Sequence, residues 1–121
     1  MKTYQSTTNR NRIVLNHRTR HTVPINSVVM LIADVNYTNF ILADGSKQLS
    51  SHPIKYFEPF LETHGFQRIH RGSMINPIFM KEYCQETSRI SMRNGMFVKV
   101  ARRKKEAFWV AIRNEELGQF C

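Results

Sequence analysis

The stretch from residue 65 to residue 77 reads GFQRIHRGSMINP. It places two arginines and a histidine within residues 68–71, after the apolar Phe66 and before the apolar pair Met74 and Ile75. This order predicts a short strand that leads into a charged loop with both ends anchored in the core. Such a loop presents cations on a rigid base, although a solvated loop between two core strands would have the same composition.

Length and composition predict a single globular domain. The chain has 121 residues, of which 41% are hydrophobic, and this length can bury one ordinary core. No apolar run approaches the ~20 residues of a membrane span, and the polar start lacks the apolar core of a signal peptide. We therefore expect a flexible arm over residues 1–9, a single domain over residues 10–121, and a cytoplasmic location.

The charge indicates an anionic partner. Lysine and arginine number 18 against 9 acidic residues, which gives a formal net charge of +9 and a sequence pI near 10.1. No acidic residue precedes Asp34. A pI above about 9 with clustered cations is typical of nucleic-acid-binding domains, although a ribosome or an anionic membrane surface would also attract such a chain.

Periodicity predicts a mainly β fold of the α+β class. The run over residues 28–33 is continuously apolar and suits a fully buried strand. Asp44-Gly45 and Asn94-Gly95 are strong hairpin signals. The other segments with strand character are β-branched, aromatic or alternating, and they cover residues 12–16, 37–42, 47–49, 67–70, 78–85, 89–93 and 96–100.

Two helices complete the predicted fold. Apolar residues recur at helical spacing from residue 54 to residue 61, which predicts a helix to about His64 with Gly65 as its stop. Ser50 or Ser51 is the expected N-cap. A final helix is predicted over residues 102–117, beginning with four cations that oppose its dipole. That unfavourable placement indicates a use for the charge on something anionic.

The sequence offers no catalytic or metal-binding arrangement. The two cysteines, Cys84 and Cys121, have no metal-ligand spacing. A disulfide between them is not expected in a reducing compartment, and Cys84 is interpreted as a half-buried hydrophobe. A nuclease needs clustered carboxylates, whereas Asp34 and Asp44 are the only aspartates. We expect no enzyme activity, no metal and no cofactor.

Two motifs resemble the LytTR family of bacterial DNA-binding domains. Arg68, His70, Arg71, Ile75 and Asn76 stand in the register of the family's RiHrSxiVN core. Residues 96–103 (MFVKVARR) resemble its last strand and the Ser-Arg that follows. The resemblance covers roughly residues 10–115. It implies an elongated sandwich of short, mostly antiparallel strands whose loops read successive major grooves of double-stranded DNA, as in a bacterial transcriptional regulator.

The resemblance also implies the DNA-contacting residues. They gather at three strand ends or turns, where Lys and Arg can contact phosphates and polar side chains can contact base edges. The expected contacts are Asn36 and Tyr37 in the first place, Arg68, His70, Arg71 and Ser73 in the second, and Lys99, Arg102, Arg103 and Lys105 in the third. Asn76 is interpreted as structural, and His70 has the alternative of bonding within its own loop.

Some residues depart from the family pattern. Gly72 stands where the family usually has Ser, and Ala101 replaces the Ser before Arg102. The DNA target sequences of other family members therefore cannot be assumed for this protein. The length leaves no room for the receiver domain of many family members. An input signal would therefore arrive through a partner protein, through the expression level or through a feature of the N-terminal arm, and a homodimer on repeated sites stays open. An RNA-binding or ribosome-associated module is the alternative, although no RNP-like aromatic pair or GXXG loop supports it.

Overall fold

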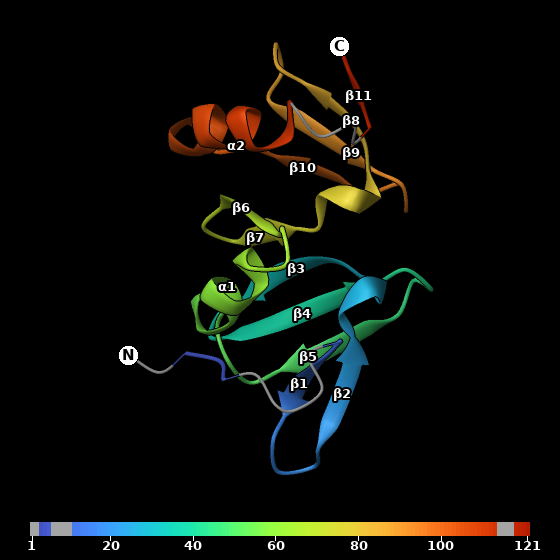
Figure 1. Cartoon of the computed structure of the whole chain (residues 1–121), viewed down its shortest axis with the longest axis vertical. Coiled ribbons are helices and arrows are strands. Elements are labelled where there is room, and N and C mark those ends of the chain that lie inside the picture. The colour runs from blue at the N-terminus through green and yellow to red at the C-terminus, as the bar shows by residue number, and fades with distance from the viewer. Residues whose placement is uncertain (1–2, 6–10, 114–117) are drawn as a thin grey trace.

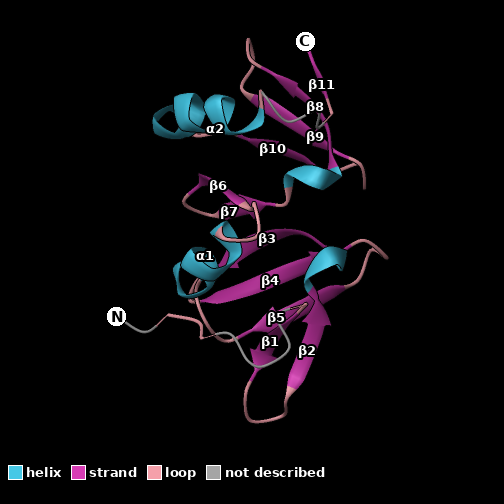
Figure 2. Ribbon diagram, in the orientation of Figure 1, coloured by secondary structure: helices cyan, strands magenta, loops and turns pink. Residues whose placement is uncertain are grey.

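The computed structural model describes residues 3–5, 11–113 and 118–121. Its elements are arranged in layers along the longest axis (Figure 1). A five-stranded sheet occupies the middle, the β1–β2 hairpin lies at the lower end, and a four-stranded sheet with the second helix lies at the upper end. Strands dominate the fold, as Figure 2 shows, so the predicted mainly β class is confirmed.

The central sheet joins strands that are far apart in the sequence. Its order is β5-β4-β3-β7-β6, and every neighbouring pair is antiparallel. The strands are β3 (Val28–Asp34), β4 (Tyr37–Leu42), β5 (Lys47–Ser50), β6 (Gln67–His70) and β7 (Ser73–Ile75). The strands of the opening motif, β6 and β7, thus form one side of this sheet, next to β3.

The sheet has a hydrophobic core on each face, which explains the continuous apolar run of β3. Val28 and Leu31 pack into one core with α1 (Ile54–Glu62) and the β1–β2 hairpin. Val29 and Met30 pack into the other core with α2 (Lys105–Ile112) and the four-stranded sheet. A strand covered on both faces needs apolar residues at successive positions rather than at alternate ones.

The two outer sheets are smaller. The lower hairpin pairs β1 (Arg12–Asn16) with β2 (His21–Pro24) in antiparallel fashion. The upper sheet has the order β10-β9-β8-β11, with β11 parallel to β8. Its strands are β8 (Met80–Cys84), β9 (Arg89–Met92), β10 (Phe97–Lys99) and β11 (Gln119–Phe120). Short 3-10 turns cover Ile25–Ser27, Pro77–Phe79 and Arg102–Lys104.

Both helices begin differently from the prediction. No side-chain cap precedes α1, whose N-cap is Pro53. Ser50 is buried at the end of β5, where its hydroxyl donates to the Leu15 carbonyl at 2.9 Å. The four cations expected at the start of the last helix form a 3-10 turn over Arg102–Lys104, and α2 begins only at Lys105. Such turns are frequent at helix starts. The predicted helix residues 114–117 lie outside the described residues.

The cysteines form a disulfide, which corrects the sequence-based expectation. Cys84 and Cys121 are bonded across 37 residues. The reason is the parallel pairing of β11 with β8, in which Phe120 lies opposite Tyr83, so that Cys121 follows beside Cys84. Neither β2 nor β11 was predicted, because each is short and takes its conformation from its partner strand.

The start of the chain is partly anchored. Of the arm predicted to be flexible over residues 1–9, the structure describes only residues 3–5. Within them, Tyr4 is buried, and its amide donates to the Tyr56 carbonyl at 2.7 Å. The Tyr4 hydroxyl accepts the Val14 amide at 2.9 Å. None of the described helices has the length and apolar character needed to cross a membrane.

Candidate nucleic-acid interface

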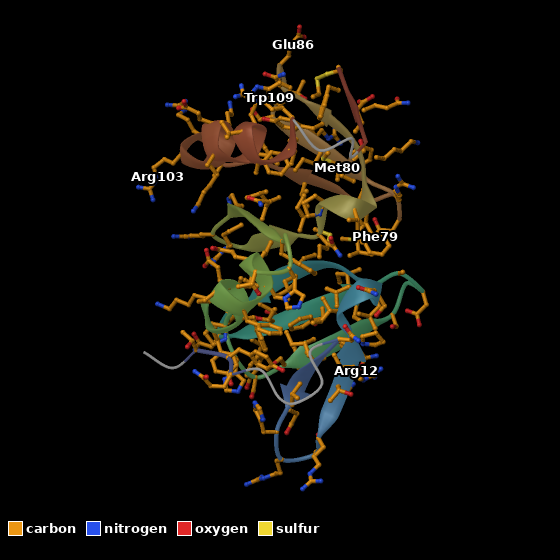
Figure 3. The ribbon with its side chains drawn as sticks, in the orientation of Figure 1. Arg12, Phe79, Met80, Glu86, Arg103 and Trp109 are labelled. Carbon is orange, nitrogen blue, oxygen red and sulfur yellow. A yellow bond between two sulfur atoms is a disulfide. The ribbon has the colours of Figure 1, made fainter. Side chains whose placement is uncertain are left out.

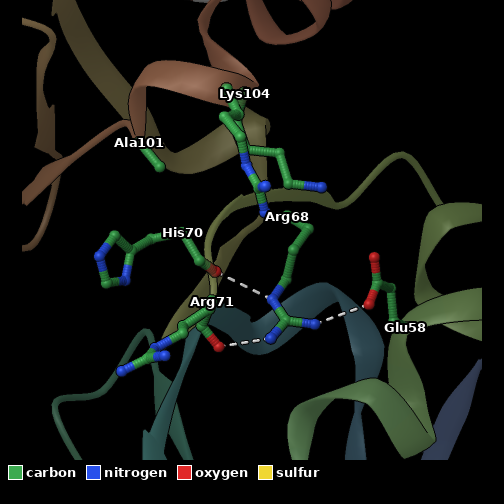
Figure 4. Close-up of a pocket in the computed structure, with 7 residues that line it drawn as sticks. Glu58, Arg68, His70, Arg71, Ala101 and Lys104 are labelled. Carbon is green, nitrogen blue, oxygen red and sulfur yellow. Dashed lines mark hydrogen bonds and ion pairs between the residues drawn. The ribbon is translucent and has the colours of Figure 1, made fainter.

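Arg68 organises the turn between β6 and β7. Its Nε donates to the His70 carbonyl at 2.9 Å, its Nη2 donates to the Arg71 carbonyl, and its Nη1 forms an ion pair with Glu58 Oε1 at 2.6 Å (Figure 4). Only 15% of the Arg68 side chain is exposed. The planar five-donor guanidinium suits this combination of acceptors. Arg68 therefore fixes the turn to α1 through Glu58.

His70 and Arg71 are exposed on the turn that Arg68 holds. The Gly72 amide donates to His70 Nδ1 at 3.0 Å, so the neutral ring that makes this bond carries its proton on Nε2 and keeps that donor for another acceptor. His70 therefore does bond within its own loop, which was the alternative to a DNA contact. Ser73 is half-buried at the start of β7.

Asn76 has the structural role expected of it. Its side chain is buried, and Nδ2 donates to the Val28 carbonyl at 3.0 Å. Its backbone amide donates to the Val29 carbonyl at 2.9 Å, and its Oδ1 accepts the Ile78 amide at 3.3 Å. These bonds tie the end of β7 to the start of β3.

A backbone hydrogen bond joins the β6–β7 turn to the basic segment after β10. The Ala101 amide donates to the Ile69 carbonyl at 2.7 Å. Between the two segments lies a hollow of about 390 Å³, shown in Figure 4. It is lined by Glu58, Arg68, His70, Arg71, Ala101, Arg103 and Lys104. Two predicted contact regions, from distant parts of the sequence, thus share one basic hollow.

Backbone hydrogen bonds link the turn between β3 and β4 to the β6–β7 turn. Ile32 pairs with Ser73, and the Ala33 amide donates to the Gly72 carbonyl at 2.9 Å. Beyond this link, Asn36 and Tyr37 are exposed at the turn. Val35 is 89% exposed with φ 57°, a conformation that is strained for a β-branched residue. The three predicted regions are therefore connected through backbone bonds at Gly72 and Ile69.

The cations after β10 do not all lie at this hollow. Arg103 lines it, and its side chain extends outward at the left edge of the molecule (Figure 3). Arg102 is exposed, and Lys105, three residues later, is half-buried. Lys99 lies on β10 opposite Arg89 and lines a separate hollow with Phe97. Of the predicted cations, Arg68, His70, Arg71 and Arg103 line the basic hollow, whereas Lys99, Arg102 and Lys105 do not, and Lys99 lines a different hollow.

Lys104 lines the hollow but was not among the predicted contacts. Its place in the run of four cations was the available signal. Lys104 also lies near the acidic pair Glu58 and Glu62, with which it lines a neighbouring hollow. Partial burial raises the pKa of Glu62, and a hydrogen bond with Glu58 and its charge raise that pKa further. Among the described residues, no three His, Cys, Asp or Glu side chains are grouped as a metal site.

A β-rich fold with a basic hollow is compatible with a nucleic-acid-binding class of domain, and comparison with known proteins identifies the family. A sequence model described as the LytTr DNA-binding domain matches residues 18–112. The chain belongs to this LytTR family, whose domain is the DNA-binding domain of transcription regulators. The predicted family is thereby confirmed.

A solved structure supports the fold. The chain is similar to the LytTr DNA-binding domain of a Bacillus cereus protein described as a methyl-accepting/DNA response regulator, with a TM-score of 0.71 and 24% identity over 84% of this chain and 96% of the other. At 24% identity, this similarity supports the fold but not a function. A search of curated proteins gave no match.

Proposed function

We propose that this protein binds double-stranded DNA sequence-specifically and regulates bacterial transcription, reading successive major grooves through its connected loops. The observation that carries this proposal is the pair of backbone bonds, Ala101 to Ile69 and Ala33 to Gly72. They hold the three exposed polar regions in fixed relative positions. A fixed arrangement lets side chains on separate loops contact separate segments of one site without an ordering cost at each loop.

The residues divide into base readers, phosphate contacts and a positioning residue. Arg102, Arg71 and His70 are exposed donors that can bond base edges. Asn36 and Tyr37 at the β3–β4 turn, and Ser73 at the start of β7, are polar residues proposed as further DNA contacts. Phosphate contacts come from Lys99, Arg103, Lys104 and Lys105. Arg68 was predicted as a contact, and we now assign it to positioning, because its guanidinium already has three protein acceptors.

We also propose a cellular location and binding partners for this protein. A regulator that binds bacterial DNA works in the cytoplasm, and its partners include double-stranded DNA. The other proposed partners are a second copy of this chain, in a homodimer on repeated DNA sites, and a separate signalling protein.

Selection from a randomised duplex pool tests the function. The wild-type protein should enrich a defined sequence, and duplex DNA of that sequence should outcompete RNA of equal length. Affinity should fall steeply between 50 and 200 mM salt, as it does for proteins that make roughly 6–10 phosphate contacts. Recovery of no preferred sequence, or stronger competition by RNA, would overturn the proposal in favour of the RNA-binding alternative.

A further inference from the structure

The β1–β2 hairpin ends in a second basic surface that has no role in the site described above. We define the basic tip as residues 17–21, which comprise His17, Arg18, Thr19, Arg20 and His21. All five are exposed. Within the described part of the chain neither arginine forms an ion pair, since the salt bridge found there joins Arg68 and Glu58. The two guanidinium groups are therefore available to an anionic ligand.

The hairpin holds this tip in a defined place. Asn16 Oδ1 accepts the backbone amides of Arg18 at 2.9 Å and Thr19 at 3.1 Å, so the turn is closed by its own side chain. At the base of the hairpin, Ile13 and Leu15 are fully buried in the lower core. The arginines are thus fixed at the backbone, and their exposed side chains keep the freedom to reach a ligand.

The basic tip is connected to the proposed DNA-binding edge. The Ser50 hydroxyl donates to the Leu15 carbonyl at 2.9 Å, just before the tip begins. Ser50 pairs with Thr38 across the β4–β5 ladder, and Thr38 follows the predicted contact residue Tyr37 directly. Two short steps therefore connect the tip to the β3–β4 turn.

The positions of these elements follow the longest axis of the molecule. Figure 1 shows the start of α2 near the upper end, the β6–β7 turn below it, the start of β4 lower again, and the tip of the β1–β2 hairpin at the lower end. A duplex has phosphates all along its length, at one charge per ≈1.7 Å of helix axis. A protein elongated along such a duplex can contact phosphates beyond the bases that it reads.

We propose that Arg18 and Arg20 of the basic tip bind the phosphate backbone of the same duplex, outside the segment read by the three loops. This inference rests on the proposed DNA-binding function. Phosphate is the expected ligand because the tip lies at the lower end of the molecule, away from the loops assigned to base reading, and phosphates are present all along a duplex. The tip therefore adds affinity and position along the DNA, but no sequence preference.

A test compares duplexes of different length. The wild-type protein first selects its preferred sequence from a random pool. That sequence is then prepared as a minimal duplex and with about one helical turn, 10 base pairs, of unrelated flanking DNA at either end or at both ends. Affinity and its salt dependence are measured for the wild type, for Arg18→Gln/Arg20→Gln, and for the control Lys81→Gln/Arg93→Gln. The control removes the same charge from exposed residues near the β9–β10 turn. This turn lies at the right of Figure 1, whereas the β6–β7 turn lies at the left.

We expect the wild type to bind more tightly when the flank at one end is present. Arg18→Gln/Arg20→Gln should lose that gain, lower the salt slope on the flanked duplex by about 2, and select the same sequence as the wild type. The control should keep the gain from the flank. Thermal unfolding should be unchanged in both variants, because no described hydrogen bond or ion pair uses these side chains.

Three results would overturn the inference. One is a wild type whose affinity does not depend on flanking DNA, and another is a tip variant that keeps the full gain from the flank. The third is a tip variant that changes the selected bases, since the tip would then read sequence. Failure of the proposed function has a different signature, because the wild type would then select no sequence at all.

Discussion

At the residue scale, Arg68 shows how a motif cation can serve a DNA site without touching DNA. Its three donor nitrogens are bonded to Glu58 and to the carbonyls of His70 and Arg71. The sequence motif places Arg68 next to the exposed cations, and nothing in that motif distinguishes it from them. The distinction comes from Glu58 on α1, a residue that only the fold brings beside the turn.

The role of Arg68 can be separated from that of a phosphate contact by Arg68→Lys. A lysine keeps the charge but has no planar fork for two carbonyls and a carboxylate. We expect Arg68→Lys to blur the base preferences in duplex selection nearly as much as Arg68→Ala, and to lower the free energy of unfolding by about 1–3 kcal/mol. A lysine variant with the wild-type base preferences would show that Arg68 acts as a charge alone.

Asn76 is the second residue whose role follows from the structure. Its amide satisfies the Val28 carbonyl and the Ile78 amide in a buried place. We expect Asn76→Ala to lower the free energy of unfolding by about 1–3 kcal/mol, because these backbone groups lose their partner. Asn76→Asp should cost more, since a carboxylate cannot donate to the Val28 carbonyl.

Urea unfolding of these variants, with the m value checked for constancy, measures the effect. The matched control is Asn94→Ala, which removes a side-chain bond to the Met96 amide in an exposed turn, where water can replace it. Equal losses for Asn76→Ala and Asn94→Ala would contradict the structural role of Asn76.

At the scale of elements, local chemistry allowed most of the fold to be predicted. The apolar run over residues 28–33 predicted β3, and Asp44-Gly45 and Asn94-Gly95 predicted the turns before β5 and β10. Each of these signals is contained in a few neighbouring residues. Strands β2, β7 and β11 were missed. They are four, three and two residues long, and none of them follows a hairpin signal such as those before β5 and β10.

The site was predictable in its parts but not in its assembly. The charged segments were visible in the sequence, whereas the bonds from Ala101 to Ile69 and from Ala33 to Gly72 join residues without any distinctive chemistry. A backbone amide and a carbonyl leave no mark in the sequence. For the same reason the sequence could not separate Lys99 from the basic hollow or assign Lys104 to it.

At the scale of the whole molecule, the disulfide attaches the last residue to the upper sheet. Cys84 lies at the end of β8 and Cys121 follows β11. Closing a loop of 37 residues restricts the unfolded chain, and the chain-entropy relation gives roughly 3–4 kcal/mol for it. Disulfides are rare in reducing compartments, so the cytoplasmic location proposed above predicts that Cys84 and Cys121 are thiols in the cell, in contrast to the disulfide in the structure.

Thermal unfolding with and without a reductant tests the contribution of this bond. The reduced protein should unfold at a lower temperature, and Cys84→Ser/Cys121→Ser should match the reduced wild type and ignore the reductant. Thiol titration before each scan establishes which form is present. An oxidised protein no more stable than its reduced form would contradict the expected restriction of the unfolded chain.

The central claim is that two segments from distant parts of the sequence, the β6–β7 turn and the segment after β10, read separate parts of one DNA site. Selection from a randomised duplex pool at fixed salt, with the wild type, His70→Ala, Arg71→Ala, Arg102→Ala and the control Arg93→Ala, tests it most directly. Arg102→Ala should relax one set of base positions, by about 1–3 kcal/mol of discrimination, and should lower binding to random duplex far less. His70→Ala and Arg71→Ala should relax a different set, and Arg93→Ala should relax none. If the three site variants instead lose affinity uniformly and keep the wild-type base preferences, these side chains contact phosphates only, and the claim is wrong.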